Sequence, residues 1–213
     1  MTITKYGHCC LLIEIQGKRI LTDPGKFSGG FEGLTKIDVI LITHEHADHF
    51  HSEAIIHILD TNPEAKVVTN SSVGKLLSEL GISYEILEGD QAGECAGVAL
   101  QAIDGTHAEI YEEYGQVQNT GYVIEHSFFY PGDAYTVPDV AIKVLALPVA
   151  GPWCKVSEAL TYALAVNPEI AIPVHDAVLS ELGKNVIYPF FNRMLHEQHI
   201  VFAPLEDGVL RTF

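Results

Sequence analysis

Apolar residues recur along this chain in two patterns, and together they predict a mixed α and β fold. Short apolar runs dominate the first third and predict strands near residues 2–5, 9–15, 18–22 and 38–42, with a hairpin turn at Gly17-Lys18. Helical and strand-like patterns alternate after that point. This combination favours two sheets packed face to face with helices outside them.

The remaining elements follow from periodicity and capping residues. Ser52 is a candidate N-cap for a helix over 52–59, and Gly81 is a candidate C-terminal glycine for a helix over 72–81. Further helices are expected at 157–166 and 184–196, and further strands at 84–87, 95–103, 119–125, 127–130, 143–147, 170–174 and 199–203. Periodicity by itself supports a mixed α and β domain and no more specific architecture.

The densest polar segment, Thr43–His49, follows an apolar run directly and holds three imidazoles and two carboxylates. These groups are the ligands that divalent transition metals accept. In an extended chain His44 and His46 share one face, whereas Asp48 and His49 lie past the turn, so two ions are plausible. A helix would place His46 nearly opposite His44, so the two imidazoles could not bind the same ion. We therefore expect a loop between a strand and a helix.

Three more polar groups follow strand-like runs and complete the candidate set. His107 comes after the run at 98–103, Asp133 after 127–130, and His175 after 170–174. Residues placed at the ends of strands, beside turn formers, are typical of a site mounted on loops. Asp104 and Asp176 are neighbours that could instead hydrogen-bond to the ligands.

The order of these groups resembles the metallo-β-lactamase superfamily, whose signature is an HxHxDH loop followed by a lone His, a lone Asp and a last His. The match spans nearly the whole chain, and it implies an α+β four-layer αββα sandwich with metals at one edge. Position by position, the resemblance implies three sets of ligands: His44, His46 and His107 for a first metal, Asp48, His49 and His175 for a second, and Asp133 as the bridge. The segments Tyr6–Glu14 and Leu21–Pro24 are similar to the compact branch of ascorbate-6-phosphate lactonase-like and zinc-dependent hydrolases.

Two ions about 3.5–4 Å apart can share a water and lower its pKa toward about 7. The sequence therefore predicts a metal-dependent hydrolase, in which a metal-bridging hydroxide attacks an ester, lactone, amide or phosphodiester bond. Asp133 would hold both ions, and Asp48 would bind one ion and orient the attacking oxygen or accept its proton. Zinc is the first choice for both ions, and manganese, iron or nickel would accept the same donors.

Weaker assignments concern residues outside the signature. His8, in a Gly7-His8 turn, is a candidate substrate-binding residue or an ordinary turn residue. Asp23, before Pro24, is expected to hydrogen-bond the metal loop in a structural role. Tyr111–Gly115 and Gly151–Cys154 could shape the entrance to the site, although ordinary packing is favoured for their aromatic rings.

The other histidines are interpreted as ordinary surface or core residues. His126 is the rival of His107, but it falls inside a predicted strand. The remaining isolated histidines are His51, His57, His196 and His199.

Length, charge and cysteine content limit the class of protein. A chain of 213 residues fits one domain spanning 1–213, with 12 basic and 28 acidic residues and a net charge of −16. This charge disfavours nucleic-acid and anionic-membrane partners, while a small anionic substrate stays compatible because metal ions offset charge locally. Four cysteines without a CxxC pair, no signal-peptide pattern and no long apolar stretch favour a cytoplasmic protein without a membrane span.

The leading hypothesis is thus a dinuclear hydrolase of a small polar or phosphorylated metabolite, a sugar lactone among them. Two alternatives stay open: a nuclease of the same superfamily, which the acidic balance disfavours, and a catalytically silent metal-binding protein. We expect a small-molecule substrate as the partner, and a homo-oligomer is compatible with the sequence.

Overall fold

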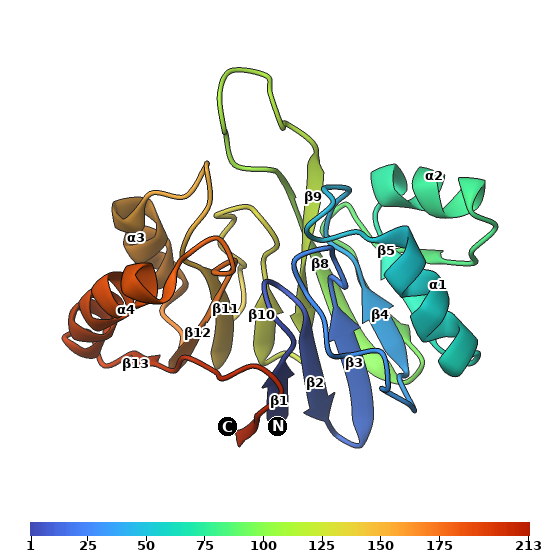
Figure 1. The fold of residues 1–213 in the computed structure, drawn as a ribbon, viewed down its shortest axis with the longest axis horizontal. Helices are drawn as coiled ribbons and strands as arrows, with labels where there is room; N and C mark the ends of the chain where they lie inside the picture. The colour runs from blue at the N-terminus through green and yellow to red at the C-terminus, as the bar shows by residue number, and fades with distance from the viewer.

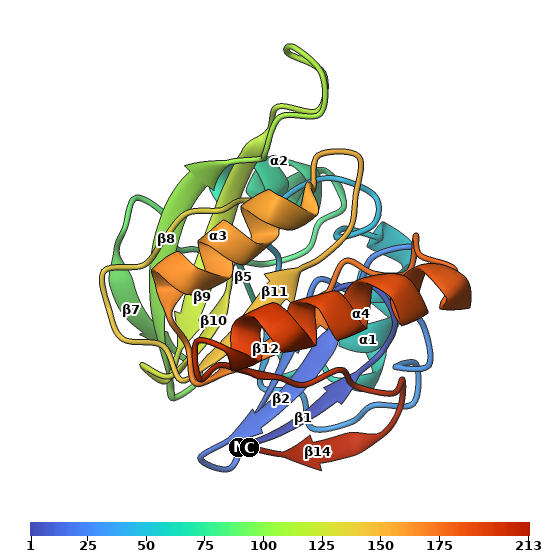
Figure 2. The same cartoon turned by 90° about the vertical axis from the view of Figure 1, so that its left-hand side faces the viewer.

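Two seven-stranded β-sheets lie face to face in the computed structural model, which describes residues 1–213. Helices cover the outer face of each sheet, as Figures 1 and 2 show from two sides. The helices are α1 (Ser52–Thr61) and α2 (Ser71–Glu79) outside the first sheet, and α3 (Val156–Val166) and α4 (Glu181–His196) outside the second. The predicted four-layer αββα sandwich is confirmed.

Each sheet joins antiparallel hairpins to a set of parallel strands. In spatial order the first sheet contains β14 (Leu210–Thr212), β1 (Thr2–Lys5), β2 (Leu11–Ile15), β3 (Lys18–Thr22), β4 (Val39–Leu41), β5 (Lys66–Thr69) and β6 (Glu85–Ile86). The second contains β13 (Val201–Phe202), β12 (Ile170–Val174), β11 (Val144–Pro148), β10 (Phe128–Tyr130), β9 (Gln118–Ile124), β8 (Val98–Thr106) and β7 (Ala92–Cys95).

Alternating apolar side chains explain the layers. On β2, Leu11 and Ile13 enter the core between the sheets, whereas Leu12 enters the core under α1 and α2. On β10, Phe128 faces the inter-sheet core and Phe129 packs toward α3 and α4. Strands with both faces buried read as continuous apolar runs, which is why the sequence marks them clearly.

The strand directions bring the candidate ligands to one edge. Strands β10, β11 and β12 are parallel, and β8 runs in the same direction because it is antiparallel to β9, which is antiparallel to β10. Their carboxyl ends therefore open on the same side of the sandwich, where loops can carry a shared site.

Most predicted elements are present, but β7 and β14 were not predicted, and three local predictions were wrong. The first hairpin turns at Gln16-Gly17, one residue early, because both residues take positive φ values of 50° and 79°. Ser52 is the first residue of α1, and His51 is its N-cap without a side-chain hydrogen bond. His126 lies exposed in the turn between β9 and β10, with φ of 52°, and not within a strand.

None of the four helices combines the length and the apolar character that crossing a lipid bilayer requires.

Candidate metal centre

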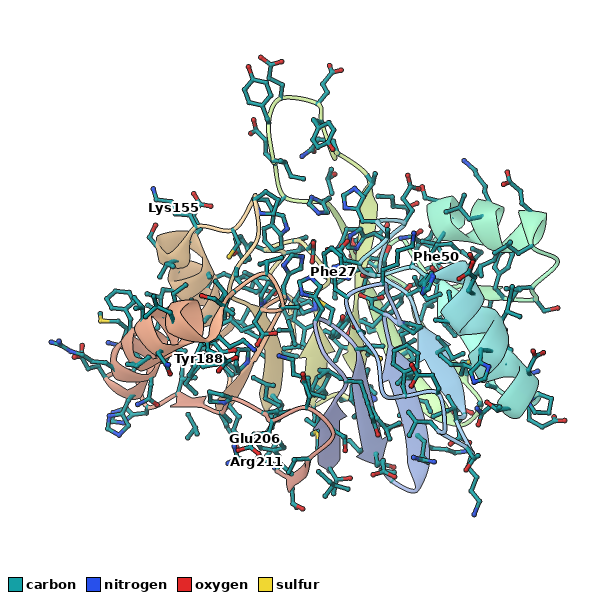
Figure 3. The ribbon with its side chains drawn as sticks, in the orientation of Figure 1. Phe27, Phe50, Lys155, Tyr188, Glu206 and Arg211 are labelled. Atoms are coloured by element: carbon teal, nitrogen blue, oxygen red, sulfur yellow. The ribbon has the colours of Figure 1, made fainter.

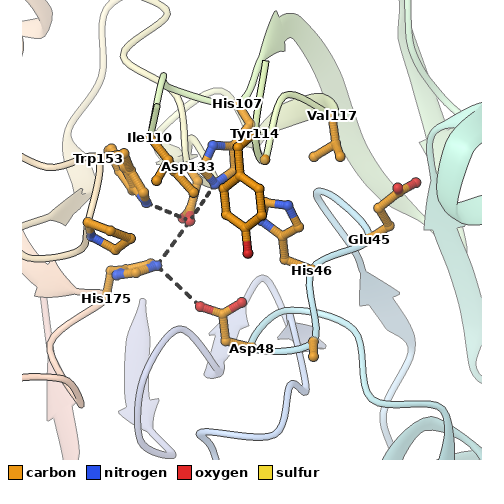
Figure 4. Close-up of a pocket in the computed structure, with 13 residues that line it drawn as sticks. Glu45, His46, Asp48, His107, Ile110, Tyr114, Val117, Asp133, Trp153 and His175 are labelled. Carbon is orange, nitrogen blue, oxygen red and sulfur yellow. Dashed lines mark hydrogen bonds and ion pairs between the residues drawn. The ribbon is translucent and has the colours of Figure 1, made fainter. Parts of the chain in front are cut away.

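The seven side chains singled out by the sequence meet at the edge where β4, β8, β10 and β12 end. Their ligand atoms form two groups, each with all atoms within 4.8 Å of one another: one contains His44, His46 and His107, and the other contains Asp48, His49, Asp133 and His175. Figure 4 shows five of these residues around one pocket of about 550 Å³: His46, Asp48, His107, Asp133 and His175.

The loop after β4 owes its shape to hydrogen bonds within it and to close contact with the segment after β3. The N–H groups of His49 and Phe50 both donate to the carbonyl of His46, at 2.9 and 2.8 Å. Gly25 lies so close to this loop that a Cβ there would be 1.8 Å from the carbonyl oxygen of Asp48. Only glycine permits this approach, so the segment after β3 holds the ligand loop in place.

Asp133 lies at the centre of the two groups. Its Oδ2 atom is 3.2 Å from His107 Nε2 and 2.9 Å from His175 Nε2. Its Oδ1 atom is 3.1 Å from His49 Nε2, and His44 Nε2 is 3.9 Å from Oδ2. One carboxylate therefore touches both candidate ligand sets.

Asp48 is the more open of the two carboxylates. Its side chain is 20% exposed, against 2% for Asp133. Asp48 Oδ2 is 3.4 Å from His175 Nε2, and Asp133 also lines the pocket but is almost fully buried. Water and substrate in the pocket can reach Asp48 directly.

Several buried atoms at the centre make no hydrogen bond, among them the Nε2 atoms of His44, His49 and His175 and Oδ1 of Asp133. A buried polar atom without a partner costs about 1–3 kcal/mol. Divalent cations between the imidazole lone pairs and the carboxylate oxygens would satisfy all four atoms. The donor set is histidine and carboxylate, which suits zinc and similar ions.

The Nδ1 atoms of His44, His49 and His107 are held by hydrogen bonds, whereas Nδ1 of His175 has no partner. His49 Nδ1 donates to Asp23 Oδ2 at 2.7 Å, and His107 Nδ1 donates to the carbonyl of Ala108 at 2.6 Å. His44 Nδ1 lies 3.0 Å from Thr43 Oγ1, which itself donates to Asp23 at 2.7 Å. These bonds place the proton on Nδ1 and leave the Nε2 lone pair directed into the centre, as metal-binding imidazoles require.

Asp23 anchors this arrangement from beneath. It is fully buried and also accepts hydrogen bonds from the Thr43 N–H at 2.8 Å and the Tyr130 hydroxyl at 2.9 Å. A single carboxylate thus contacts His49 directly and His44 through Thr43.

The electrostatics are those of closely packed opposite charges. Burial lowers the pKa of His44 well below its ordinary value, so that imidazole is neutral. Burial opposes ionisation of Asp133, but the neighbouring His49 and His175 outweigh it and hold the pKa of Asp133 well below its ordinary value. Burial by itself would lower the pKa of His175. The nearby Asp133 carboxylate outweighs burial, so the pKa of His175 lies well above its ordinary value. Asp133 is therefore ionised and available as an oxygen ligand.

His8 approaches the centre from behind Asp48 and does not line the open pocket. It is fully buried, its Nδ1 atom accepts the N–H of Ala177 at 3.2 Å, and its Nε2 atom lies 3.3 Å from Asp48 Oδ2. Its ring is 4.0 Å from that of His175. His8 and the adjacent Cys9 also form a group with His49 and His175 whose ligand atoms lie within 4.8 Å.

Two hydrogen bonds to the buried carboxylates were not expected from the sequence. The indole N–H of Trp153 donates to Asp133 Oδ2 at 3.1 Å, and the Tyr130 hydroxyl reaches Asp23. Trp153 follows β11, whose carboxyl end opens on the same edge as β10 and β12. Trp153 follows the strand expected at 143–147. The sequence does not show that this strand lies between β10 and β12, so it does not place Trp153 at the site.

Other polar residues flagged by the sequence lie outside the centre. Asp104 accepts the Gly89 N–H, and Asp176 pairs with Lys5 at 2.5 Å, so both make their hydrogen bonds away from the candidate ligands. The isolated histidines belong to none of the clustered ligand groups: His51, His57, His126, His196 and His199.

Comparison with known proteins identifies the family of this chain. A family model described as the beta-lactamase superfamily domain matches residues 2–175. A Mycobacterium tuberculosis protein, Rv0786c, is 37% identical over 193 residues, which cover 88% of this chain and 90% of that protein. A UPF0173 metal-dependent hydrolase of Methanocaldococcus jannaschii is 27% identical over 190 residues, covering 81% and 83% of the two chains.

Among solved structures, Igni18, a metallo hydrolase from Ignicoccus hospitalis, superposes with a TM-score of 0.76 at 20% identity, and the match covers 100% of this chain and 98% of that one. That similarity concerns the fold. The chain belongs to the beta-lactamase superfamily and, within it, to the metal-dependent hydrolases.

Proposed function

We propose that this enzyme hydrolyses an ester, lactone or phosphodiester bond of a small molecule with a pair of divalent ions, zinc being the first choice. The observation that carries the proposal is a set of buried atoms without hydrogen-bond partners. They are Oδ1 of Asp133 and the histidine Nε2 atoms that surround this carboxylate. The relative in Methanocaldococcus jannaschii, named a metal-dependent hydrolase, supports the same class of reaction.

The donors divide into two sets that share one carboxylate. His44, His46 and His107 would hold one ion, Asp48, His49 and His175 the other, and Asp133 both. Ions held by these residues would supply a water of lowered pKa, toward about 7, and would polarise the bond to be cleaved.

The residues around the ions have separate tasks in this proposal. Asp48 is the carboxylate exposed to the pocket, so it orients the attacking water or accepts its proton. Trp153 fixes the rotation of the Asp133 carboxylate through its indole N–H. His8, within 3.3 Å of Asp48, positions that carboxylate from behind and does not contact substrate.

Metal analysis tests the proposal directly. We expect the purified enzyme to contain about two divalent ions per chain, to lose hydrolysis when they are chelated, and to regain it when zinc is restored. The assay is a panel of esters, lactones, phosphodiesters and thioesters. A protein that holds its ions and turns over none of the panel would support the silent metal-binding alternative.

Asp23 offers a test of how the ligands are oriented. In Asp23→Asn the new side-chain amide faces the His49 Nδ1–H group, so we expect metal affinity to fall about 10- to 100-fold. Competition with a coloured zinc chelator measures the change. The control is Asp38→Asn. Asp38 precedes β4, at the end of that strand opposite the ligand loop, and accepts the backbone N–H of Arg19, so this variant should keep its metal affinity. Equal affinities for the two variants would contradict the assigned role of Asp23.

A further inference from the structure

The loop between β8 and β9 and the segment after β11 form the mouth of the pocket. The first loop stands well clear of both sheets in Figure 1, and Figure 3 shows its side chains projecting outward. It contributes Ile110, Tyr114 and Val117 to the pocket, and the segment after β11 contributes Pro152 and Trp153. Apart from the candidate ligands, the wall facing a substrate is therefore mainly apolar and aromatic.

Tyr114 presents an uncovered ring at this mouth. Its side chain is 74% exposed although it lines the pocket, and in Figure 4 the ring crosses the opening beside His46. Gly115 lets the loop approach the centre, because a Cβ there would lie 2.7 Å from Ile110 Cδ1 and 3.8 Å from His46 Cε1. A bound molecule would cover the free face of this ring.

Trp153 forms a fixed second wall. Its side chain is only 6% exposed, and its ring packs edge-on against His107 and His175 at 5.6 and 5.4 Å. Its N–H group is occupied by Asp133, so it offers a substrate ring surface and not a hydrogen bond.

Beyond the candidate ligands, the mouth carries a single charged side chain, and that charge is negative. Among the 13 lining residues it is the carboxylate of Glu45, and the lining contains no lysine or arginine. The ions can bind the oxygen at the bond being cleaved, but a second anionic group on the substrate would extend toward Glu45 and the apolar wall. Such a group would lose its hydration without gaining a cation.

We propose that the substrate is uncharged outside its scissile group and carries an aromatic or apolar substituent that packs between Tyr114 and Trp153. This inference rests on the two-ion hydrolase proposed above. It favours neutral esters and lactones over phosphorylated metabolites and phosphodiesters. Water supplies hydroxyl to the acyl carbon and a proton to the leaving oxygen, so no further reactant is needed.

Hydroxamates test the inference without knowledge of the natural substrate, because they chelate metal ions through the same two oxygens whatever group they carry. Calorimetric titration of the metal-loaded enzyme would compare acetohydroxamate, benzohydroxamate and 4-carboxybenzohydroxamate. We expect benzohydroxamate to bind about tenfold tighter than acetohydroxamate, and the carboxylated ring to bind about tenfold weaker than the plain ring.

Two variants and a matched control identify the residues responsible. Tyr114→Ala should remove most of the advantage of the ring and leave acetohydroxamate binding unchanged. Tyr111→Ala, on the same loop but outside the pocket lining and 69% exposed, should behave as the unmodified enzyme. Val117→Lys should close the gap between the carboxylated and plain rings.

The outcomes separate the two proposals. If acetohydroxamate does not bind the metal-loaded enzyme, the ion centre itself is wrong. If acetohydroxamate binds but the phenyl ring adds nothing, or the carboxylated ring binds as tightly as the plain one, the ion centre stands and the proposed substrate class is overturned. An unchanged preference for the ring in Tyr114→Ala overturns the role of that residue.

Discussion

Asp133→Ala is expected to lower kcat/KM about 10³-fold or more and to reduce the bound metal in the same preparation. Asp133 is the one carboxylate within 3.2 Å of nitrogens from both candidate ligand sets, at His49, His107 and His175. Its loss removes an anionic ligand and leaves several imidazoles in a buried site without a counter-charge. Steady-state kinetics and elemental analysis of the same sample measure both effects.

Asp139→Ala is the matched control, because it makes the same change at an exposed position on the segment that follows β10. That variant should keep its metal and its activity. An Asp133→Ala enzyme with the activity of the control would contradict the assignment of Asp133 as the shared ligand.

Lys5→Met is expected to lower the free energy of unfolding by about 3 kcal/mol, since it removes one partner of a buried ion pair. Lys5 Nζ lies 2.5 Å from Asp176 Oδ1, and both side chains are 3% exposed. The Tyr188 hydroxyl also donates to Asp176, and Lys184 Nζ is 3.6 Å away, so part of the carboxylate remains satisfied. Urea unfolding of the metal-free protein measures the loss without a contribution from bound ions.

The half-buried pair Lys18 and Asp38, 3.5 Å apart with side chains 34% and 30% exposed, provides the comparison. Lys18→Met should change the unfolding free energy by less than about 0.5 kcal/mol, because solvent screens that pair. Adding Asp176→Asn to Lys5→Met should recover part of the stability, since the unpaired buried charge is then removed. Equal urea midpoints for Lys5→Met and Lys18→Met would show that the buried pair does not contribute as described.

The seven side chains that the sequence grouped lie together in the structure, and their role as metal ligands stays a prediction. The Thr43–His49 loop could be recognised because its ligands are local, and local spacing limits which side chains share an ion. His107, Asp133 and His175 could be proposed because each follows a strand, although their convergence depends on strand order that only the structure provides. The resemblance to a known family supplied that order in advance.

Interactions between distant segments could not be read from local pattern. Trp153 and Tyr130 look like ordinary core aromatics in the sequence, yet each donates a hydrogen bond to a buried carboxylate of the centre. Nothing in the sequence near His8 places it beside Asp48, since the two meet only when the segment after β1 packs under the metal loop.

Strands at the edges of the sheets were predicted least well. The strand β14 has three exposed residues without apolar alternation, and it forms because its backbone pairs with β1. The strand expected near 95–103 corresponds to β8, which begins at Val98 after a turn at Ala96-Gly97. Strand β7 was not predicted, because three of its four residues are exposed and it forms by pairing with β8. Whether such a segment forms a strand depends on the neighbouring strand with which it pairs more than on the β-propensity of its own residues.

Anomalous diffraction from crystals of the zinc-loaded enzyme would locate the ions themselves. We expect two zinc peaks about 3.5–4 Å apart, one among His44, His46 and His107, the other among Asp48, His49 and His175, with Asp133 touching both. A single peak, or zinc bound away from Asp133, would contradict this assignment.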